Sequence, residues 1–211
     1  MKTVYIMGTS AVAFSVFFSE GLARLGYKVL LLDDSAGKVL LGTLNREPLD
    51  IPVEDYHGID VGKGEELVPE GYHFVIYYSD SQEHIGERKV DLLYLVSGSS
   101  KSEMEKTFFI QKQYEGAWVL LKGIPQEKKS LSYYTHFFCL SEESERRTAV
   151  IWFDYFDYRM EADFGFEPAV LLSRLSDSYR LLLVDWISKL TERTTREVHR
   201  MLKKKRGWDR L

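Results

Sequence analysis

The sequence predicts an α/β fold: a three-layer, doubly wound sheet that is mostly parallel, with helices on both faces. Short apolar runs of strand length alternate with stretches of helical spacing, which is typical of a sheet built from βαβ units. The chain has 211 residues, 45% of them hydrophobic and 28% charged, which suffices for one domain with a substantial core. With no internal repeat or linker, we expect one domain at 1–190 and a basic C-terminal helix or tail at 191–211.

The first βαβ unit is the clearest part of the pattern. Thr3–Met7 is a short apolar run, Val12–Leu25 has helical spacing, and Val29–Leu32 reads as a buried strand closed by Asp33. The turn Gly8–Ala11 joins the first strand to the helix. Such a turn lies against a helix N-terminus, where free N–H groups and the helix dipole favour a phosphate. The turn is therefore the first place to look for a nucleotide site.

The remaining elements follow in the same alternation, except at 34–60, where turn residues and two prolines prevent an assignment. Apolar runs predict four further strands, and helical spacing predicts three helices, the first with Ser99 or Ser100 as N-cap and Glu103 in its first turn. We expect 141–147 to be an exposed connection, and Asp154, Asp157 and Asp163 to frame a loop. The predicted strands are 74–79, 91–97, 117–121 and 148–153, and the predicted helices are 101–114, 132–140 and 169–190.

The sequence LARLGYKVLLLD at 22–33 resembles the MinD/ParA family of P-loop ATPases, which belongs to the SIMIBI class. The strand YHFVIYYS at 72–79 and the strand VIWF at 150–153 are similar to later strands of that family. The resemblance spans about residues 1–190 and implies a P-loop NTPase fold. It extends to the atypical branch of the family that localises Flp/Tad-type pilus machinery.

In that family the turn after the first strand reads K-G-G-x-G-K-[ST]; its glycines wrap the phosphates and its lysine neutralises them. Here the turn reads GTSAVAFS at 8–15, so the lysine position holds Phe14 in one alignment and Ala11 in the other. Neither lysine nor arginine occurs between Lys2 and Arg24. The resemblance therefore implies that the Walker A lysine is absent.

The other positions of the family site are altered too. Asp33 keeps the first strand-ending aspartate, whereas Ser35 stands at the second, and Tyr78 replaces the aspartate that orients the metal-bound water. Lys122 stands close to where the family places an adenine-reading asparagine. The degenerate nucleotide-site positions are Gly8, Thr9, Ser10, Ala11, Phe14, Ser15, Asp33, Ser35, Tyr78 and Lys122.

These losses indicate a pseudo-ATPase with no catalytic residues, acting as a positioning, scaffold or assembly factor through protein–protein contacts. We expect no cofactor, although residual nucleotide binding stays open. The expected partner is another protein or a second copy, as a homodimer or as a heterodimer with an active homologue. The interface candidates are bulky aromatic residues in or beside the site, which could form an apolar patch, although Phe17 and Phe18 could equally face the core. These candidates are Phe14, Phe17, Phe18, Tyr77 and Tyr78.

Two other functions stay open at this point. One is an atypical nucleotide-binding enzyme, either a weak ATPase or an NAD(P)-dependent Rossmann oxidoreductase. For the latter, Gly8 keeps only the first glycine of the G-x-G-x-x-[GA] pattern, with Asp33 or Asp34 as the ribose-binding acid. The other is a DNA-partition accessory protein that binds DNA through the basic tail.

The tail differs in composition from the body. Residues 193–210 carry eight basic residues against Glu197 and Asp209, a formal net charge of +6. Such a segment could bind anionic lipid or nucleic acid, and the side chains of Met201, Leu202 and Trp208 favour lipid. A solvated helix is the alternative. The anion-binding candidates are Arg196, Arg200, Lys203, Lys204, Lys205 and Arg206.

Cysteine and histidine usage bears on compartment and metals. Cys139 is the single cysteine, and we expect it to be a buried, inert thiol. Without a signal peptide or a bilayer-length apolar run, we expect a cytoplasmic protein, with contact at the inner face of the membrane left open. The five histidines are scattered, without the spacing of a metal site, so we expect no metal.

Overall fold

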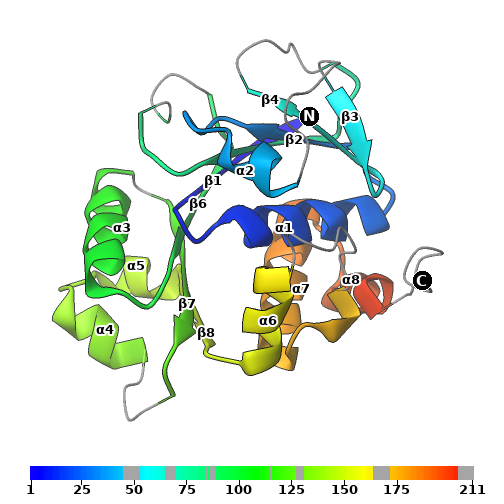
Figure 1. Cartoon of the computed structure of the whole chain (residues 1–211). Coiled ribbons are helices and arrows are strands. Elements are labelled where there is room, and N and C mark those ends of the chain that lie inside the picture. Colours follow the sequence, from blue (N-terminus) through cyan, green and yellow to red (C-terminus); the bar gives the residue numbers. More distant parts are fainter. Residues whose placement is uncertain are drawn as a thin grey trace.

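The computed structural model describes residues 1–44, 53–64, 70–83, 85, 89–114, 116–126, 131–163 and 172–203. These residues form an eight-stranded sheet with helices on both faces (Figure 1). Every neighbouring pair of strands is parallel except the pair at one edge, which is an antiparallel hairpin. The predicted fold class is therefore confirmed. In spatial order the strands are β3 (Val53–Tyr56), β4 (Ile59–Lys63), β2 (Val29–Asp33), β5 (Phe74–Ser79), β1 (Lys2–Met7), β6 (Leu92–Ser97), β7 (Trp118–Ile124) and β8 (Thr148–Trp152).

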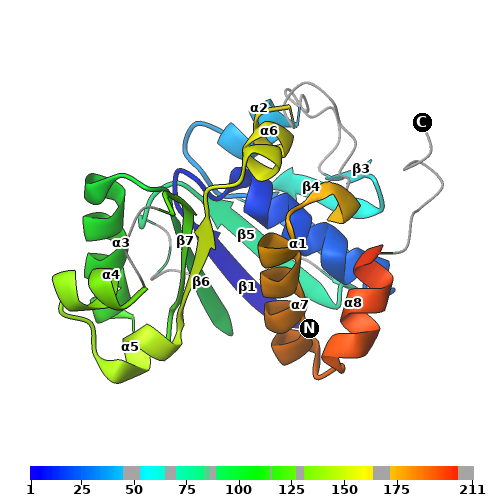
Figure 2. The same cartoon turned by 90° about the horizontal axis from the view of Figure 1, so that it is seen from below.

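The helices divide between the two faces of the sheet (Figures 1 and 2). One face is covered by α1 (Val12–Arg24), α7 (Asp177–Thr191) and α8 (Thr195–Lys203), and the other by α3 (Lys101–Gln113). Side chains alternate along each strand, so Val4 and Ile6 join the core on the α1 side while Tyr5 and Met7 join the core on the α3 side. The shorter helices are α2 (Val39–Thr43), α4 (Leu131–Phe137), α5 (Glu142–Arg146), α6 (Tyr155–Asp163) and the 3-10 helix η2 (Leu172–Arg174).

Helix α1 is buried on all sides, between the sheet and the pair α7 and α8. Its sequence, VAFSVFFSEGLAR, is apolar around most of its circumference, which is typical of a helix with no solvent face. Gly21 lies where α1 meets the other two helices, because a Cβ there would lie 2.5 Å from Ile187 Cδ1 and 3.3 Å from Leu202 Cδ2. The absence of a side chain at this position lets α7 and α8 pack directly on α1.

Three sequence expectations are wrong. The stretch 141–147 has no buried residue, as expected, but it forms the short helix α5, for which Ser141 accepts a hydrogen bond from the N–H of Ser144. Asp157 and Asp163, expected to frame a loop, belong to α6, and Asp154 caps that helix by accepting hydrogen bonds from the N–H groups of Phe156 and Asp157. Cys139, expected to be buried, is exposed; it follows α4 in a left-handed backbone conformation with a φ of 51°.

The C-terminal region is partly as expected. The closing helix α7 begins at Asp177, later than the predicted residue 169, because Ser176 caps it by accepting from the N–H of Tyr179. Residues 164–171 lie outside the described part of the chain. The helix expected in the basic tail forms as α8, and its Val198 and Leu202 are buried in the core that α1 and α7 share. No helix among the described residues is long and apolar enough to span a lipid bilayer.

Candidate functional site

The turn between β1 and α1 is held tightly against β6. Gly8 has a φ of 140°, and a Cβ on it would lie 1.9 Å from the carbonyl oxygen of Val96. Its N–H donates to the carbonyl of Ser79 at 2.9 Å, and its own carbonyl accepts from the N–H of Ala11 at 3.0 Å. The first turn of α1 contains no acidic residue, and its N-cap Ala11 offers no side-chain acceptor. The geometry leaves Thr9 and Ser10 as the polar side chains of the turn.

The carboxylate of Glu103, on α3, lies over this turn. Its Oε1 accepts hydrogen bonds from the hydroxyls of Thr9 at 2.5 Å and Ser10 at 3.2 Å, and its Oε2 accepts from Ser100 at 3.1 Å. Partial burial acts to raise the pKa of Glu103, but these hydrogen bonds, with the charge of Lys122, outweigh burial and hold the pKa below its usual value. Glu103 is therefore ionised at neutral pH, and a negative charge lies on the turn.

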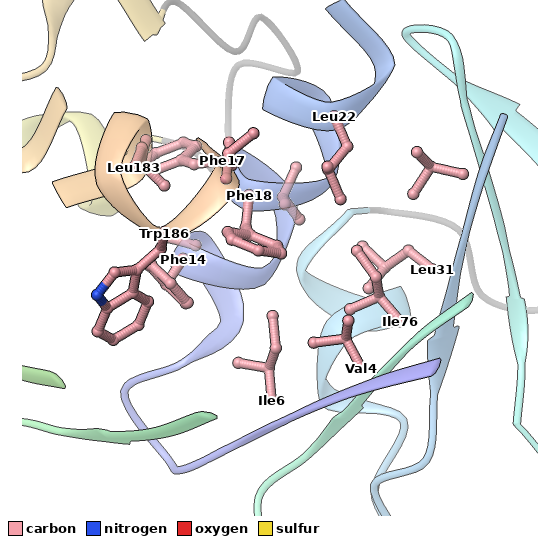
Figure 3. Close-up of a cluster of buried hydrophobic side chains, with 14 of the residues drawn as sticks. Val4, Ile6, Phe14, Phe17, Phe18, Leu22, Leu31, Ile76, Leu183 and Trp186 are labelled. Carbon is pink, nitrogen blue, oxygen red and sulfur yellow. The ribbon is translucent and has the colours of Figure 1, made fainter. Parts of the chain in front are cut away.

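Both positions that the resemblance offers for the Walker A lysine are fully buried. Ala11 and Phe14 have no exposed surface. The Phe14 ring lies against Phe18 and Trp186, with a ring-centre distance of 5.7 Å to each (Figure 3). The ring centre of Tyr94 lies 6.4 Å from that of Phe14. Both side chains belong to the hydrophobic core on the α1 side of the sheet, so neither is exposed to a ligand at the turn.

The hydroxyl of Ser15 is bound to the backbone. It donates to the carbonyl of Ala11 at 2.9 Å, one helical turn back, and the side chain is fully buried. The helix itself therefore uses the hydroxyl that the resemblance places beside the phosphates.

The predicted aromatic interface is wrong in the form proposed. Phe14, Phe17, Phe18 and Tyr78 are fully buried and Tyr77 is 7% exposed, so they present no patch to solvent. The alternative that Phe17 and Phe18 face the core is confirmed (Figure 3). The physical reason is the burial of α1 on all sides, which leaves its aromatic residues no outward direction.

Asp33 and Ser35 bind each other and the backbone after β2. Asp33 Oδ1 accepts from the hydroxyl of Ser35 at 2.6 Å and from its N–H at 3.0 Å, while Oδ2 accepts from the N–H of Leu41 at 2.9 Å. Both side chains are fully buried. They hold the segment that leads into α2, so the acid retained from the family pattern has a structural role here.

Tyr78 fills the end of β5 with an aromatic ring. Its hydroxyl is buried and has no hydrogen-bond partner among the described residues. Burial raises the pKa of Tyr78, and the charges of Asp80 and Asp33 raise it further, so the phenol stays protonated and neutral. A neutral phenol cannot take the place of a carboxylate that orients a metal-bound water.

A cavity of about 480 Å³ opens beside the turn, at the carboxyl ends of β1, β6, β7 and β8. Inside it Lys122 Nζ lies 2.5 Å from Glu161 Oε2, and Glu161 Oε1 accepts from the hydroxyl of Tyr179 at 3.3 Å. Burial, and then the charge of Glu161, raises the pKa of Tyr179. The cation of Lys122 is already paired within the protein.

Asp157, on the cavity wall, also has its own partners. Its carboxylate accepts from the N–H of Ser176 at 2.6 Å and from the Ser176 hydroxyl at 2.5 Å. Burial raises its pKa, and the two hydrogen bonds from Ser176 oppose that rise. Among the described residues, no group of three or more His, Cys, Asp or Glu side chains could hold a metal ion.

The structure gathers only some of the predicted site residues. Gly8, Thr9, Ser10 and Ala11 form the turn, and Lys122 lies in the adjoining cavity. Phe14, Ser15, Asp33, Ser35 and Tyr78 are buried beneath it. Of the tail candidates, Arg196, Arg200 and Lys203 are exposed on α8, and Lys204, Lys205 and Arg206 lie outside the described residues.

The order of the strands distinguishes between nucleotide-binding folds. In this sheet β5 lies between β1 and β2, whereas a Rossmann sheet has its first two strands side by side. The Rossmann oxidoreductase alternative is therefore not supported. The observed arrangement is instead found in solved structures of another class.

The chain superposes on MinD of Aquifex aeolicus in a MinC:MinD cell division complex with a TM-score of 0.66 and 14% identity, covering 92% of this chain and 97% of that one. A second MinD structure from the same organism superposes with a TM-score of 0.64 at 14% identity, covering 92% of this chain and 98% of that one. A plasmid partition protein of Borrelia burgdorferi superposes with a TM-score of 0.51 at 13% identity, covering 72% of this chain and 90% of that one. The chain has the MinD/ParA fold. Neither a family model nor a curated protein sequence matches it, so the likeness is one of fold.

Within this MinD/ParA fold, the residue that sequence reasoning missed is Glu103. The pattern Ser-x-x-Glu at 100–103 predicts a capping acid, and Ser100 does cap α3 by accepting from the N–H of Glu103 at 3.2 Å. Local spacing does not indicate that the side chain also reaches Thr9 and Ser10, more than 90 residues away in the chain. The Lys122–Glu161 pair was missed for the same reason.

Proposed function

We propose that this chain is a non-hydrolysing protein with the MinD/ParA fold that acts through protein contacts, as a positioning, scaffold or assembly factor. The observation that carries the proposal is the hydrogen bonding of the Glu103 carboxylate to Thr9 and Ser10 in the turn between β1 and α1. The carboxylate takes up the hydroxyl donors that a phosphate needs. It also brings a negative charge that repels a phosphate, in a turn without a lysine.

Hydrolysis of a nucleotide also needs charged groups that act on the phosphates, and the residues at several of these positions cannot supply them. Neither candidate lysine position carries a charge, Ser15 donates within its helix, and Asp33 is engaged by Ser35 and Leu41. Phosphoryl transfer depends on charge stabilisation by such groups acting together. A partner protein is in keeping with the MinC:MinD complex among the matched structures, in which the MinD protein meets another protein.

Nucleotide binding tests the proposal most directly. Calorimetric titration of the full chain with ATP and ADP, with and without Mg²⁺, should give no binding tighter than about 1 mM and no turnover. Glu103→Gln keeps the size of the side chain and removes its charge, so pyrophosphate binding should strengthen about tenfold, as expected for one charge at about 4 Å. Glu105→Gln is the matched control on the exposed side of the same helix, and it should change nothing.

Micromolar binding of ATP·Mg²⁺ by the wild-type chain, with turnover that Phe14→Ala and Ser35→Ala leave unchanged, would overturn the proposal. If Glu105→Gln strengthens pyrophosphate binding as much as Glu103→Gln does, the net charge of the protein, and not the carboxylate at the turn, explains the stronger binding.

Returning a lysine to the turn is expected to fail. In Phe14→Lys the ammonium group enters the core beside Trp186 and Tyr94, so the free energy of unfolding should fall by about 3 kcal/mol or more without any gain in ATPase turnover. Phe109→Lys is the control, because Phe109 is 60% exposed on α3 and the same change there should cost little. Urea denaturation and a phosphate-release assay measure the two outcomes. A stable Phe14→Lys variant that hydrolyses ATP would contradict the expectation.

A further inference from the structure

An exposed aromatic surface runs from the end of β8 into α6. Phe153, Tyr155, Phe156 and Tyr158 are 48%, 62%, 68% and 61% exposed, within six consecutive residues. Their rings lie beside one another in pairs, Phe153 with Tyr158 at 6.0 Å and Tyr155 with Phe156 at 6.1 Å. Four large aromatic side chains at this exposure are typical of a contact surface. We call residues 153–163 the aromatic shelf.

The aromatic shelf is acidic. Residues 153–163 carry four carboxylates against Arg159, a formal net charge of −3. Asp157 is buried and Glu161 pairs with Lys122, so Asp154 and Asp163 are the carboxylates left for the surface. Phe156 and Asp163 lie seven residues apart and hence on one face of α6. Arg159 pairs with Asp163 at 3.2 Å, but both side chains are more than half exposed, so the pair is weak. Such a surface suits cationic side chains, which bind both carboxylates and aromatic faces.

The opposite charge lies on α8. Arg196, Arg200 and Lys203 follow one another at i, i+4 and i+7 and are all exposed, so they form a basic stripe along the outer face of the helix. The inner face carries Val198 and Leu202, which are buried. No ion pair involves the three basic residues within the described part of the chain. We call them the basic stripe.

The aromatic shelf and the basic stripe lie on the same side of the sheet. Met160 of α6 packs on the core that α1, α7 and α8 share, and η2 contacts both α6 and α8 (Figure 2). Two complementary surfaces on one side of a molecule can pair twice across a two-fold axis, shelf to stripe and stripe to shelf. A symmetric dimer would therefore contain the contact between shelf and stripe twice.

We propose that the aromatic shelf is the docking site for the basic stripe of a second copy of this chain. In this arrangement Arg196 and Arg200 lie over the exposed rings and pair with Asp154 and Asp163. This association does not use the turn at Gly8, although Phe153, Asp154 and Tyr158 of the shelf also line the cavity beside that turn. Self-association is measured without nucleotide, so its outcome is distinguishable from that of the nucleotide titration.

Reciprocal charge reversal tests it. Sedimentation velocity of the full chain at low salt should give a dimer at about 100 µM that dissociates as salt rises. Arg196→Glu/Arg200→Glu should weaken self-association at least about tenfold, and so should Ala162→Lys/Asp163→Lys on the shelf. An equimolar mixture of the two variants should recover the dimer, because each now carries the complement of the other. Phe156→Ala, at an exposed position, should weaken association without affecting folding.

Lys101→Glu/Lys106→Glu on the exposed face of α3 is the matched control, since it changes the charge by the same amount and should leave the dimer intact. A wild-type chain that stays monomeric at low salt overturns the proposal. So does a mixture of the two reversed variants that stays monomeric. If Arg196→Glu/Arg200→Glu instead abolishes binding to anionic vesicles or duplex DNA while the oligomeric state is unchanged, the stripe binds those surfaces and the proposal is wrong.

Discussion

Replacing Arg24 with leucine should lower the free energy of unfolding by about 3–5 kcal/mol, because it removes the positive charge and the two hydrogen bonds that Arg24 supplies to the buried carboxylate of Glu20. Arg24 and Glu20 are 5% and 1% exposed in α1, and Arg24 Nε and Nη2 donate to Glu20 Oε1 at 2.8 and 2.6 Å. Arg24 Nη1 also donates to the carbonyl of Leu202 at 3.3 Å, close to the end of α8. Chemical denaturation of the full chain measures the loss.

Two further variants separate charge from packing. Glu20→Met/Arg24→Leu removes both charges and should recover most of the stability, since an apolar pair of similar volume avoids the desolvation cost. Arg159→Leu breaks an exposed pair with the same i, i+4 spacing and should cost less than about 1 kcal/mol. Equal losses in the single and double variants would mean that packing, and not the uncompensated carboxylate, explains the effect.

Gly8→Ala should be at least as damaging, with a loss of about 4 kcal/mol or failure to fold, because two penalties add. The new Cβ would lie 1.9 Å from the carbonyl oxygen of Val96, a backbone atom that cannot move without shifting β6. The φ of 140° is also unfavourable for any residue with a side chain. The thermal midpoint and the soluble yield measure the result.

Gly26→Ala is the comparison that isolates the collision at Gly8. Gly26 also has a positive φ, of 88°, but a Cβ there meets no atom within 4 Å. Its loss should stay at about 1–2 kcal/mol, the cost of the left-handed conformation alone. If the two substitutions cost the same, the close approach of the turn to β6 is not what requires a glycine at position 8.

The parts of the fold that sequence predicts well are those with one dominant period. The strands β1, β2, β5 and β6 are near-continuous apolar runs. The sequence of α1 carries apolar residues at helical spacing over its whole length, a pattern that loops do not have. The antiparallel hairpin of β3 and β4 was not assigned, because its short strands, VEDY and IDVGK, contain charged residues or glycine between their apolar residues and so carry no apolar run. Helix α6 was missed because Asp157 is its one buried residue, so no apolar stripe indicates a helix.

The candidate site divides in the same way. The absence of a lysine and the identity of the turn residues are facts of the sequence. The position of Glu103 depends on how α3 lies beside the turn, which local spacing does not encode. The sequence does not decide whether the aromatic side chains near the turn are exposed or belong to the core. Only the packing of α7 against α1, with Trp186 beside Phe14, decides for the core.

The packing of Phe14 also determines which residues position 14 can accept. One ring contacts residues of α1, β6 and α7, and Tyr94 and Trp186 stack on each other at 4.6 Å beside it. A lysine at this position therefore needs changes at several neighbours at once, because contacting residues do not act additively. Each single-step intermediate carries either a cavity or a buried charge. The aromatic core as a whole, and not one contact, therefore opposes a lysine at position 14.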